Sequence, residues 1–424
     1  MNILLLGSGG REHAIAHKLS QSKHCSKLLI APGNAGTAQC GINRPFSVTD
    51  FEAIKACCQD EYIDMVIVGP EEPLVKGIVD FLLKESGLNL HIIGPSKEAA
   101  QLEGSKAFAK AFMQRHNIPT AAYKEFTAEN FEEGISYLQQ HPLPIVLKAD
   151  GLAAGKGVII CQNHVEAISE FELMIQRSKF GDAGKRVVIE EFLNGIELSV
   201  FVLTDGRDYL LLPEAKDYKR IGEGDTGLNT GGMGAISPVP FADDAFMQKV
   251  VTRIVEPTVR GLHRDELNYQ GFIFIGLMKM GDEPYVIEYN CRMGDPETEV
   301  VLPRIKNDLA ELLQATATGN LASVTIDKDS RYATTIVAVS GGYPAEYGKG
   351  FEITALDTPI EDTFIFHMGT KTVDGKIVTN GGRVLCATAL DEDLDNAINK
   401  SRDLIEELQF EEKYFRRDIG FEFL

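Results

Sequence analysis

The chain has 424 residues, of which 44% are hydrophobic and 25% charged, fractions that are ordinary for a globular protein and exclude a disordered or fibrous one. The length is enough for about three domains. With 42 Lys and Arg against 62 Asp and Glu, the formal charge is −20, so the surface repels nucleic-acid phosphates and anionic lipid. We therefore expect no nucleic-acid partner and no membrane association, whereas a small anion held by a few local basic groups is compatible with this charge.

The cysteine pattern and the short apolar runs indicate a reducing compartment. The seven cysteines include no C-x-x-C pair, so neither a disulfide framework nor a zinc ribbon is expected. The first apolar run, Ile3–Leu6, is short and has no basic leader, and no later run approaches the ~20 apolar residues of a membrane span. We therefore expect a cytoplasmic protein.

The first hundred residues alternate short apolar runs with stretches of helical periodicity. Glycine follows the end of each run, which is where an open doubly wound sheet places its ligand crevice. The pattern predicts a doubly wound α/β domain with a parallel sheet over residues 1–104. Its predicted strands are Ile3–Leu6, Leu28–Ile30, Met65–Val68 and Leu90–Ile93.

The middle of the chain, residues 105–328, reads as a second domain that a helix over Ser96–Arg115 leads into. Two short apolar runs, Ile145–Ala149 and Val158–Cys161, flank a glycine-rich turn and predict a hairpin. The glycine-rich stretch Gly222–Gly234 reads as a loop that a ligand must hold or that is mobile. The other expected elements are a helix over Asp243–His263 and strands over Val187–Glu190, Leu198–Leu203, Tyr209–Leu212, Phe272–Met280 and Tyr285–Tyr289.

The last segment, residues 329–424, predicts a small α/β domain. A helix is expected over Asp391–Leu408. The expected strands are Thr334–Val339, Thr363–His367 and Arg383–Ala389.

The first motif with chemical content is Gly7–His13, which follows the first strand and opens a helix. Backbone N–H groups and the positive helix end there suit an anion. As a dinucleotide fingerprint it is incomplete, because Glu12 replaces the third glycine and the second strand ends in Ala31–Gly33 without an acidic residue. The motif favours a phosphate or phosphosugar site over a nicotinamide site, with a purely structural turn as the alternative.

The second motif, Gly151–Gly157, is not a Walker A loop, because only three residues separate its first two glycines and Gly157 follows Lys156. Since it joins two strands, it fits a flexible flap laid over phosphates. Lys148 on the preceding strand would reach those phosphates as a point charge. A plain hairpin turn is the alternative.

The third motif is the strand that ends in Glu288, Tyr289 and Asn290. Residues two apart on a strand face the same side, so Glu288 and Asn290 present two oxygen ligands together, and Arg292 shares that side. Oxygen ligands suit Mg²⁺ that bridges nucleotide phosphates, whereas a solvated edge strand is the alternative. Because Ile287, Tyr289 and Cys291 alternate as apolar residues, the sheet is half buried and its polar groups need a partner.

Taken together, these motifs resemble the glycinamide ribonucleotide synthetase family of the ATP-grasp superfamily, and the resemblance runs from end to end. The stretches that carry it are Gly7–His13, Ala31–Thr37, Gly69–Glu71, Pro73–Gly77, Gln101–Lys106, Lys148–Gly157, Asp225–Gly227, Asn229–Gly234, Glu288–Glu297 and Thr379–Val384. The resemblance implies a central ATP-grasp domain with a lid at about residues 121–190, and a monomer or weak dimer. The implied activity is ATP-dependent ligation of glycine to 5-phosphoribosylamine through glycyl phosphate, in purine biosynthesis.

The resemblance also implies a role for each matching residue. ATP would lie between two sheets, with Mg²⁺ or Mn²⁺ on Glu288 and Asn290. Catalytic contacts to glycine would come from Arg292, Asp295 and Asp225. The implied ATP-binding residues are Lys106, Lys148, Gly155, Lys156, Gly157, Glu190, Glu191, Leu193 and Glu197. The implied phosphoribosylamine residues are Gly9, Gly10, Arg11, Glu12, Asn34, Gly69, Pro70, Glu71, Asn229 and Thr230.

The sequence departs from the family pattern at Lys216 and Tyr218, where Gln and His are usual, and at Met293, where Phe is usual. These departures put the roles of Lys216 and Tyr218 in doubt. Three rival functions are another ATP-grasp ligase with a different carboxylate, a nicotinamide oxidoreductase and a nucleotide sensor without turnover. The missing acidic residue disfavours the second, and the intact Glu288, Asn290 and lysines disfavour the third.

Overall fold

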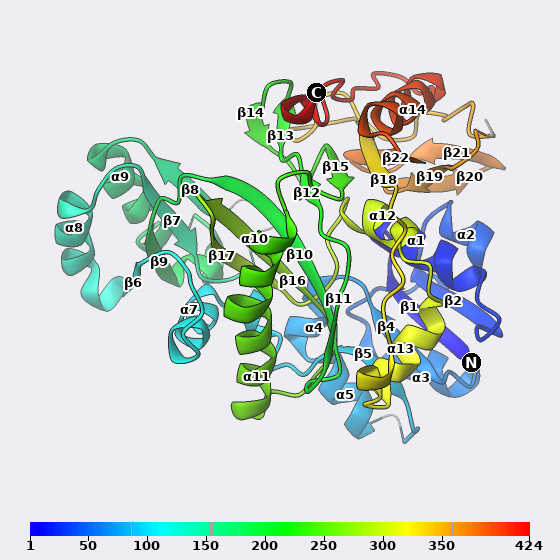
Figure 1. The fold of residues 1–424 in the computed structure, drawn as a ribbon, viewed down its shortest axis with the longest axis horizontal. Helices are drawn as coiled ribbons and strands as arrows, with labels where there is room; N and C mark the ends of the chain where they lie inside the picture. Colours follow the sequence, from blue (N-terminus) through cyan, green and yellow to red (C-terminus); the bar gives the residue numbers. More distant parts are fainter. Residues whose placement is uncertain (86, 153–156, 178, 358–359) are drawn as a thin grey trace.

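A computed structural model describes residues 1–85, 87–152, 157–177, 179–357 and 360–424 (Figure 1). Its amino-terminal part is a parallel sheet in the order β5-β4-β1-β2-β3, which confirms the doubly wound prediction. The strands are β1 (Asn2–Gly7), β2 (Lys27–Pro32), β3 (Ile42–Asn43), β4 (Met65–Val68) and β5 (His91–Pro95). The helices between them are α1 (Gly10–Ser20), α2 (Thr37–Cys40), α3 (Phe51–Asp60), α4 (Glu71–Lys76) and α5 (Ile78–Glu85).

This sheet does not end at β5. The start of the twelve-residue strand β16 (Tyr269–Met280) pairs antiparallel with β5, and the rest of β16 pairs with β10 (Ile196–Thr204) and β17 (Glu283–Asn290). With β11 (Tyr209–Leu211), the result is one nine-stranded sheet. The strand predicted from the sequence starts only at Phe272, because Gln270 and Gly271 interrupt the apolar run of β16. The continuous sheet fixes the position of the central segment relative to the first hundred residues.

A second, four-stranded sheet lies apart from the first, on the left in Figure 1, and we call it the lid sheet. Its order is β6 (Tyr123–Thr127), β9 (Arg186–Glu191), β7 (Ile145–Ala149) and β8 (Val158–Cys161). The predicted hairpin is confirmed, since Lys148 pairs with Val158 in an antiparallel register. The helices α8 (Phe131–Gln140) and α9 (His164–Ile175) pack on it around a core of its own that includes Phe126, Leu147 and Phe171.

The helix predicted over Ser96–Arg115 is wrong in its extent. The structure has two helices, α6 (Gln101–Gly104) and α7 (Lys106–Arg115), separated by Ser105 in an extended conformation. The Ser105 hydroxyl accepts a hydrogen bond from the backbone N–H of Phe108 and donates one to Asp150. A side chain that caps a new helix in this way competes with continuing the old one. As a result, Lys106 begins a helix beside the lid sheet.

The loop predicted over Gly222–Gly234 is also wrong. The chain there forms a hairpin of β13 (Arg220–Gly222) and β14 (Thr226–Asn229), followed by β15 (Gly234–Ser237). Gly224 and Asp225 turn the hairpin with positive φ angles of 65° and 54°, a conformation that glycine and aspartate tolerate better than most residues. The glycines therefore make a tight turn rather than a structureless loop.

A five-stranded sheet completes the fold, in the order β12-β15-β18-β22-β19. Its strands β12 (Lys216–Asp217) and β15 precede the nine-stranded sheet's β16 in the chain, whereas β18 (Tyr332–Val339), β19 (Thr363–His367) and β22 (Arg383–Asp391) follow it. The predicted last helix is present as α14 (Leu394–Glu407), capped by Asp393. A small hairpin of β20 (Thr370–Val373) and β21 (Lys376–Thr379) lies beside this sheet.

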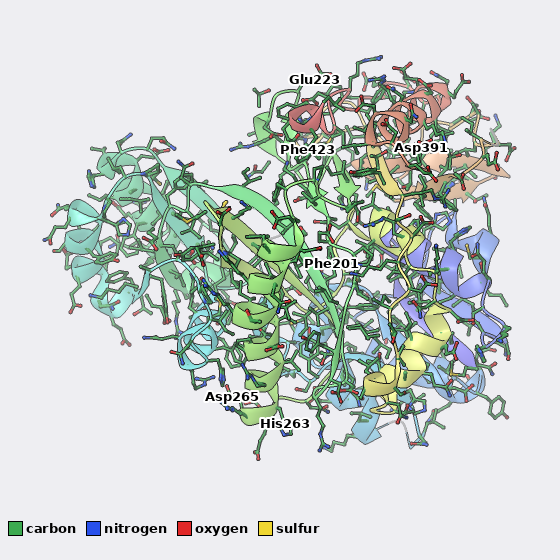
Figure 2. The ribbon with its side chains drawn as sticks, viewed as in Figure 1. Phe201, Glu223, His263, Asp265, Asp391 and Phe423 are labelled. Carbon is green, nitrogen blue, oxygen red and sulfur yellow. The ribbon has the colours of Figure 1, made fainter. Side chains whose placement is uncertain are left out.

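The remaining helices cover the nine-stranded sheet. The predicted helix Asp243–His263 is confirmed as α10 (Asp244–Val250), a π-helical turn (Val251–Val255) and α11 (Glu256–Arg264). Two further helices are α12 (Thr298–Val301) and α13 (Leu309–Ala317). Side chains fill the space between the layers, with Phe201 of β10 buried and Glu223 and His263 exposed at the periphery (Figure 2). In the described ranges, no helix is long and apolar enough to cross a membrane.

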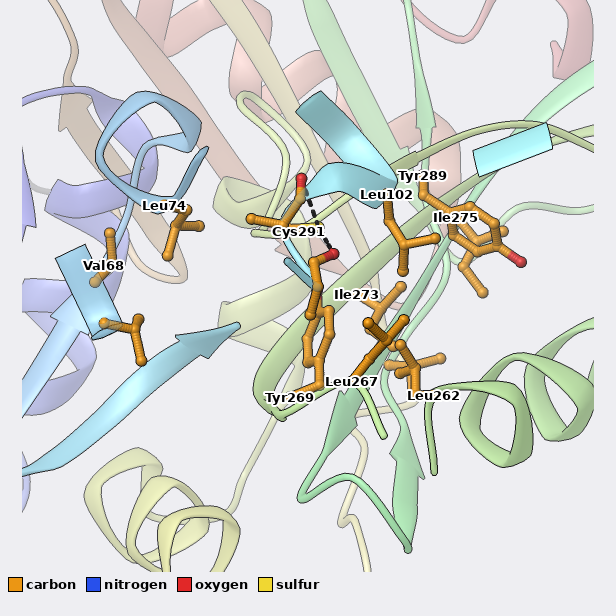
Figure 3. Packing of buried hydrophobic residues seen from close by; sticks show 14 of the residues in the cluster. Val68, Leu74, Leu102, Leu262, Leu267, Tyr269, Ile273, Ile275, Tyr289 and Cys291 are labelled. Carbon is orange, nitrogen blue, oxygen red and sulfur yellow. Dashed lines mark hydrogen bonds between the residues drawn. The ribbon is translucent and has the colours of Figure 1, made fainter. Parts of the chain in front are cut away.

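The largest apolar cluster lies under the nine-stranded sheet (Figure 3). Its members include residues of α4, α6, α11, β16 and β17, and several are fully buried. Burying one such Leu or Ile side chain contributes about 1.5–3 kcal/mol. The residues shown include Leu74, Leu102, Leu262, Tyr269, Ile273, Ile275 and Tyr289. This packing makes the strands β16 and β17 a rigid base for the polar side chains on their other face.

Candidate active site

A cavity of about 450 Å³ lies above the nine-stranded sheet. Its floor is made of β10, β16 and β17, in which Ser199, Gly276 and Glu288 stand opposite one another in register. Residues two apart on a strand face the same side, so Glu197 joins Ser199 and Asn290 joins Glu288 in the lining. Leu152, Gly157 and Val158 of the lid sheet form the opposite wall.

The structure brings together ten of the residues that the sequence singled out. They come from α1, α4, α7, the lid hairpin, β10, the segment after β14, and β17 with the loop after it. The ten in the cavity lining are Arg11, Glu71, Lys106, Gly157, Glu197, Thr230, Glu288, Asn290, Arg292 and Asp295.

Glu288 lies deep in this cavity among cations. Removal from bulk water would raise its pKa, but the charges of Lys106, Lys219, Lys148 and Arg292 outweigh that effect and leave the pKa below its ordinary value. Glu288 is therefore an ionised carboxylate at neutral pH.

Arg292 is held by two carboxylates from different helices. Its Nη2 lies 2.8 Å from Glu103 Oε1 and its Nε lies 3.2 Å from Glu71 Oε2. Nη2 also donates to Asn290 Oδ1 at 3.2 Å. The second oxygen of Glu103 accepts the backbone N–H of Cys291 at 2.7 Å. Sequence reasoning gave Glu103 no role, because its partners lie nearly two hundred residues away in the chain.

The glycine loop before α1 is closed by its own acidic residue. Glu12 Oε2 accepts the backbone N–H of Gly9 at 2.8 Å, and Glu12 Oε1 pairs with Arg11 Nε at 2.6 Å. A side chain at Gly69 would collide with Glu12, since a Cβ there would lie 2.1 Å from Glu12 Oε1. Glu12 and Gly69 thus shape the loop, and they leave Arg11 at the cavity.

The loop also meets the segment after β17. The backbone N–H of Arg11 donates to Asp295 Oδ2 at 3.2 Å, and Arg383 Nη2 lies 3.2 Å from Asp295 Oδ1. Arg383 lines the cavity, although sequence reasoning placed it only within a matching motif. Asn34 is buried and donates to the carbonyls of Ser8 and His367, each at 2.9 Å. Its amide therefore joins the loop to β19. Gly10 and Pro70 lie in the same region at the starts of α1 and α4.

On β9, an inner strand of the lid sheet, Glu190 lies between two buried lysines. Lys148 Nζ is 2.9 Å from Glu190 Oε2, and Lys110 Nζ is 3.2 Å from Glu190 Oε1. Lys148 also donates to the carbonyl of Ile287 on the cavity floor, at 3.1 Å. Burial lowers the pKa of Lys110 to about 8, against the opposing charge of Glu190. Glu191 is exposed and accepts the N–H of Ala122, whereas Leu193 is buried.

Four predicted site residues lie elsewhere or cannot be placed. Asp225 sits at the turn of the β13–β14 hairpin, outside the described lining, and pairs with Arg416 at 2.7 Å. Asn229 is exposed at the end of β14. Gly155 and Lys156 lie outside the described residues.

Three further cavity residues to which sequence reasoning gave no role are Asp217, Lys219 and Glu297. Removal from bulk water would lower the pKa of Lys219, but Glu197, Asp217 and Glu288 raise it above its ordinary value, so Lys219 stays charged. Burial raises the pKa of Glu297 to about 8, with Asp217 adding to the effect. The alternation of Lys216, Asp217, Tyr218 and Lys219 was the available signal, but it did not show which pair faces the cavity.

The residues present fit a magnesium ion that phosphates help to hold. Within the described ranges, no three His, Cys, Asp or Glu side chains gather as a complete metal site. Glu288 and Asn290 offer one ionised carboxylate and one amide oxygen on the same face. Mg²⁺ is typically held by one or two carboxylates with substrate phosphates and water, so a partial set of this kind suits it.

Comparison with known proteins identifies the family. Three models of phosphoribosylglycinamide synthetase match: the N domain over residues 1–103, the ATP-grasp (A) domain over residues 104–298 and the C domain over residues 333–422. The chain belongs to the phosphoribosylglycinamide synthetase family. It is 47% identical to a phosphoribosylamine–glycine ligase of Haemophilus influenzae, over 99% of this chain and 98% of that protein. The chain is thus an ATP-grasp ligase.

Solved structures agree with this family. The crystal structure of a phosphoribosylamine–glycine ligase from Thermotoga maritima has a TM-score of 0.85 and 36% identity, covering 99% of this chain and 100% of that one. The biotin carboxylase domain of a 2-oxoglutarate carboxylase from Hydrogenobacter thermophilus has a TM-score of 0.74 at 15% identity, covering 97% and 91%. The latter likeness shows the shared ATP-grasp fold alone.

Proposed function

We propose that this synthetase-family chain ligates glycine to 5-phosphoribosylamine, converting ATP to ADP and phosphate, in purine biosynthesis in the cytoplasm. The observation that carries the proposal is the cavity, whose lining sets five cationic side chains among seven carboxylates, including the ionised Glu288, in a molecule of strongly negative charge. The cations are Arg11, Lys106, Lys219, Arg292 and Arg383. Such a set suits two phosphorylated substrates and a carboxylate.

ATP would lie between the lid sheet and the floor strands. Lys106 and Lys148 would contact its phosphates, with Gly155, Lys156 and Gly157 of the lid hairpin above them. Glu190, Glu191 and Leu193 would border the adenine, and Glu197 would accept hydrogen bonds from the ribose hydroxyls. Lys106 and Glu197 already line the cavity, and Lys148 reaches its floor through the Ile287 carbonyl, which supports this placement.

Magnesium, or manganese, would be held by Glu288 and Asn290 together with the phosphates. When bound, the ion supplies positive charge that offsets the charge on the phosphate oxygens. The carboxylates of Glu71 and Glu103 hold Arg292 beside Asn290, whose Oδ1 accepts from Arg292 Nη2 and keeps a second lone pair for the metal.

Phosphoribosylamine would bind at the start of α1, where Gly9 and the backbone N–H of Arg11 face Asp295 and Gly10 faces Glu299. Glycine would bind near Arg292 and Asp295. The proposed contact of Asp225 with glycine has less support, because Asp225 pairs with Arg416 on the hairpin turn. Monomer or weak dimer is our proposal for the oligomeric state.

The chemistry is positioning and charge neutralisation. The glycine carboxylate attacks the γ-phosphorus of ATP, giving glycyl phosphate and ADP. The amine of phosphoribosylamine then attacks the acyl carbon, and inorganic phosphate leaves with the former carboxylate oxygen. Lysines and arginines neutralise the moving negative charge, and no side-chain nucleophile is required.

An assay of ADP release tests the proposal. ADP should appear in full amount only when glycine and phosphoribosylamine are both present, and glycine labelled with ¹⁸O in its carboxylate should transfer one label to inorganic phosphate per turnover. ADP release that depends on bicarbonate rather than glycine would assign the chain to another ATP-grasp activity. AMP as the product would refute the acyl-phosphate mechanism.

A further inference from the structure

The residues Lys216–Lys219 form a thin wall of the cavity. Asp217 and Lys219 line the cavity on one side. Lys216 and Tyr218 lie on the other side, as alternation along a strand requires, and both contact Glu422. A segment about two hundred residues later therefore backs the wall of the cavity.

One carboxylate fixes both outward residues of the wall. Lys216 Nζ lies 2.6 Å from Glu422 Oε1, and the Tyr218 hydroxyl donates to Glu422 Oε2 at 2.9 Å. Lys216 Nζ also lies 4.0 Å from the centre of the Tyr218 ring, so the three groups form a closed set. Tyr218 is 1% exposed and Lys216 9% exposed, so water competes little for these contacts.

The same carboxy-terminal segment, residues 414–422, also holds the β13–β14 hairpin in place. Arg416 is fully buried, pairs with Asp225 at 2.7 Å and donates to the carbonyl of Arg220 at 3.2 Å. Asp418 accepts the N–H of Gly224 at 2.7 Å, and the Tyr414 hydroxyl donates to the carbonyl of Ile221 at 2.9 Å. Figure 2 labels Glu223 of the hairpin and Phe423, which follows this segment, in the same upper region.

The wall is tied to cavity residues on its inner side as well. Lys219 pairs with Glu197 of β10, and its backbone carbonyl accepts from the N–H of Thr230 at 2.7 Å. Displacing Tyr218 would therefore move Lys219, Glu197 and Thr230 together. Misplacement of such groups by about 1 Å can cost on the order of a hundredfold in activity.

We propose that the 414–422 segment, acting through Glu422 on Lys216 and Tyr218, positions Lys219 and Asp217 for binding of Mg-ATP. The proposal rests on the function proposed above, and it makes Glu422 a positioning residue that does not itself touch the nucleotide. Lys216 and Tyr218 then belong to this contact and have no direct part in the chemistry.

The test is nucleotide binding by calorimetry with the full chain and Mg-ATP, without the other substrates. Glu422→Gln should weaken binding about tenfold, as loss of an outer contact typically does. Tyr218→Phe, which removes only the hydroxyl, should also weaken Mg-ATP binding. It provides the test if Glu422→Gln does not fold. Glu406→Gln is the matched control, because Glu406 pairs with Arg417 of the same segment on its exposed side, and it should bind as the parent does.

A double-mutant cycle separates positioning from general stability. Lys216→Gln and Glu422→Gln break one contact, so the double variant should bind Mg-ATP about as well as the weaker single variant. Variants with lower melting temperatures but an unchanged Kd for Mg-ATP would overturn the inference, and so would additive losses. A parent protein that binds no Mg-ATP would overturn the proposed function together with this inference.

Discussion

Glu288 shows how one strand position acquires its chemistry from the rest of the molecule. A carboxylate removed from water tends to take up a proton, but four basic side chains from different parts of the chain keep Glu288 ionised. The strand by itself fixes only which way the side chains point, by placing Glu288 and Asn290 on one face. The charge state, by contrast, depends on Lys106, Lys148 and Lys219.

Substitution of this residue gives the first prediction. Glu288→Gln keeps the size of the side chain but removes the charge that would hold the metal. Outer partners of metal ligands typically contribute 10–100-fold, so loss of a ligand should lower kcat/KM by more than about 100-fold. Steady-state kinetics at saturating Mg²⁺ measure this. Glu283→Gln, on the same strand but paired with surface residues Lys249 and Arg253, is the control. Equal activity of both variants would remove Glu288 from the site.

Lys148 and Lys110 give a second prediction at this scale. Both are buried against Glu190, so removing either should reduce stability by a similar amount. Lys148 also reaches the cavity floor, whereas Lys110 instead contacts Thr120, the carbonyl of Ala121 and the ring of Tyr123. We expect Lys148→Met to raise the Kd for Mg-ATP at least about tenfold and Lys110→Met to leave it nearly unchanged. Calorimetry measures both, and an equal loss in the two variants would argue against a phosphate contact.

At the scale of elements, apolar periodicity located the strands of the first parallel sheet and the lid hairpin. Periodicity alone did not locate the break at Ser105, where the hydroxyl caps α7 through Phe108 and also donates to Asp150 of the lid hairpin. Nor could it resolve the Gly222–Asn229 region, where contacts from Arg416 and Asp418 turn a glycine-rich stretch into a hairpin. Long-range polar contacts of this kind leave no local pattern.

The residues of the candidate site likewise divide into those that a local sequence pattern reveals and those that it does not. Residues that follow a strand end or alternate along a strand, such as Arg11, Glu288 and Asn290, were visible from their spacing and their family motifs. Glu103 and Lys219 were not, since their roles arise from partners on other elements, Arg292 and Glu197.

The contact of α1 with β19 gives a prediction on pH. The backbone N–H of His367 donates to His13 Nδ1 at 2.7 Å, so that nitrogen carries no proton. Burial lowers the pKa of His13, and it lowers that of His367 to about 4. Below an unfolded pKa of about 6.5, the unfolded chain binds protons that the folded chain does not.

The free energy of unfolding should therefore fall as pH decreases from about 6.5 toward about 4, by about 2 kcal/mol at about pH 5 from His367 alone, and His13 should add to this fall. Denaturant titrations across this range measure it. His13→Asn, which keeps an acceptor without a titrating ring, should flatten the dependence. His263→Asn, at an exposed position on α11, should not. A parent-like slope in His13→Asn would contradict this account.

At the scale of the whole molecule, two sheets each contain strands from more than one of the regions matched by the N, A and C family models. The nine-stranded sheet joins residues 2–95 to residues 196–290, and the five-stranded sheet joins residues 216–237 to residues 332–391. Within each of these sheets, neither of the two joined regions can unfold without breaking strand pairs with the other. The lid sheet differs, because its four strands pair only with one another and its apolar core is its own.

This organisation predicts two levels of local stability. Units with their own core open at lower free energy than the structure they are attached to. Native-state hydrogen exchange in rising guanidinium should therefore give the amides of β7 and β9 a lower opening free energy than those of β1, β4 and β18, which should share one value. Mg-ATP at about 100 times its Kd should raise the lid value by about 2.7 kcal/mol, because binding needs Lys148 in place on β7. A single opening free energy for all five strands would show that the lid unfolds with the rest, and a lid value insensitive to Mg-ATP would separate Lys148 from the nucleotide.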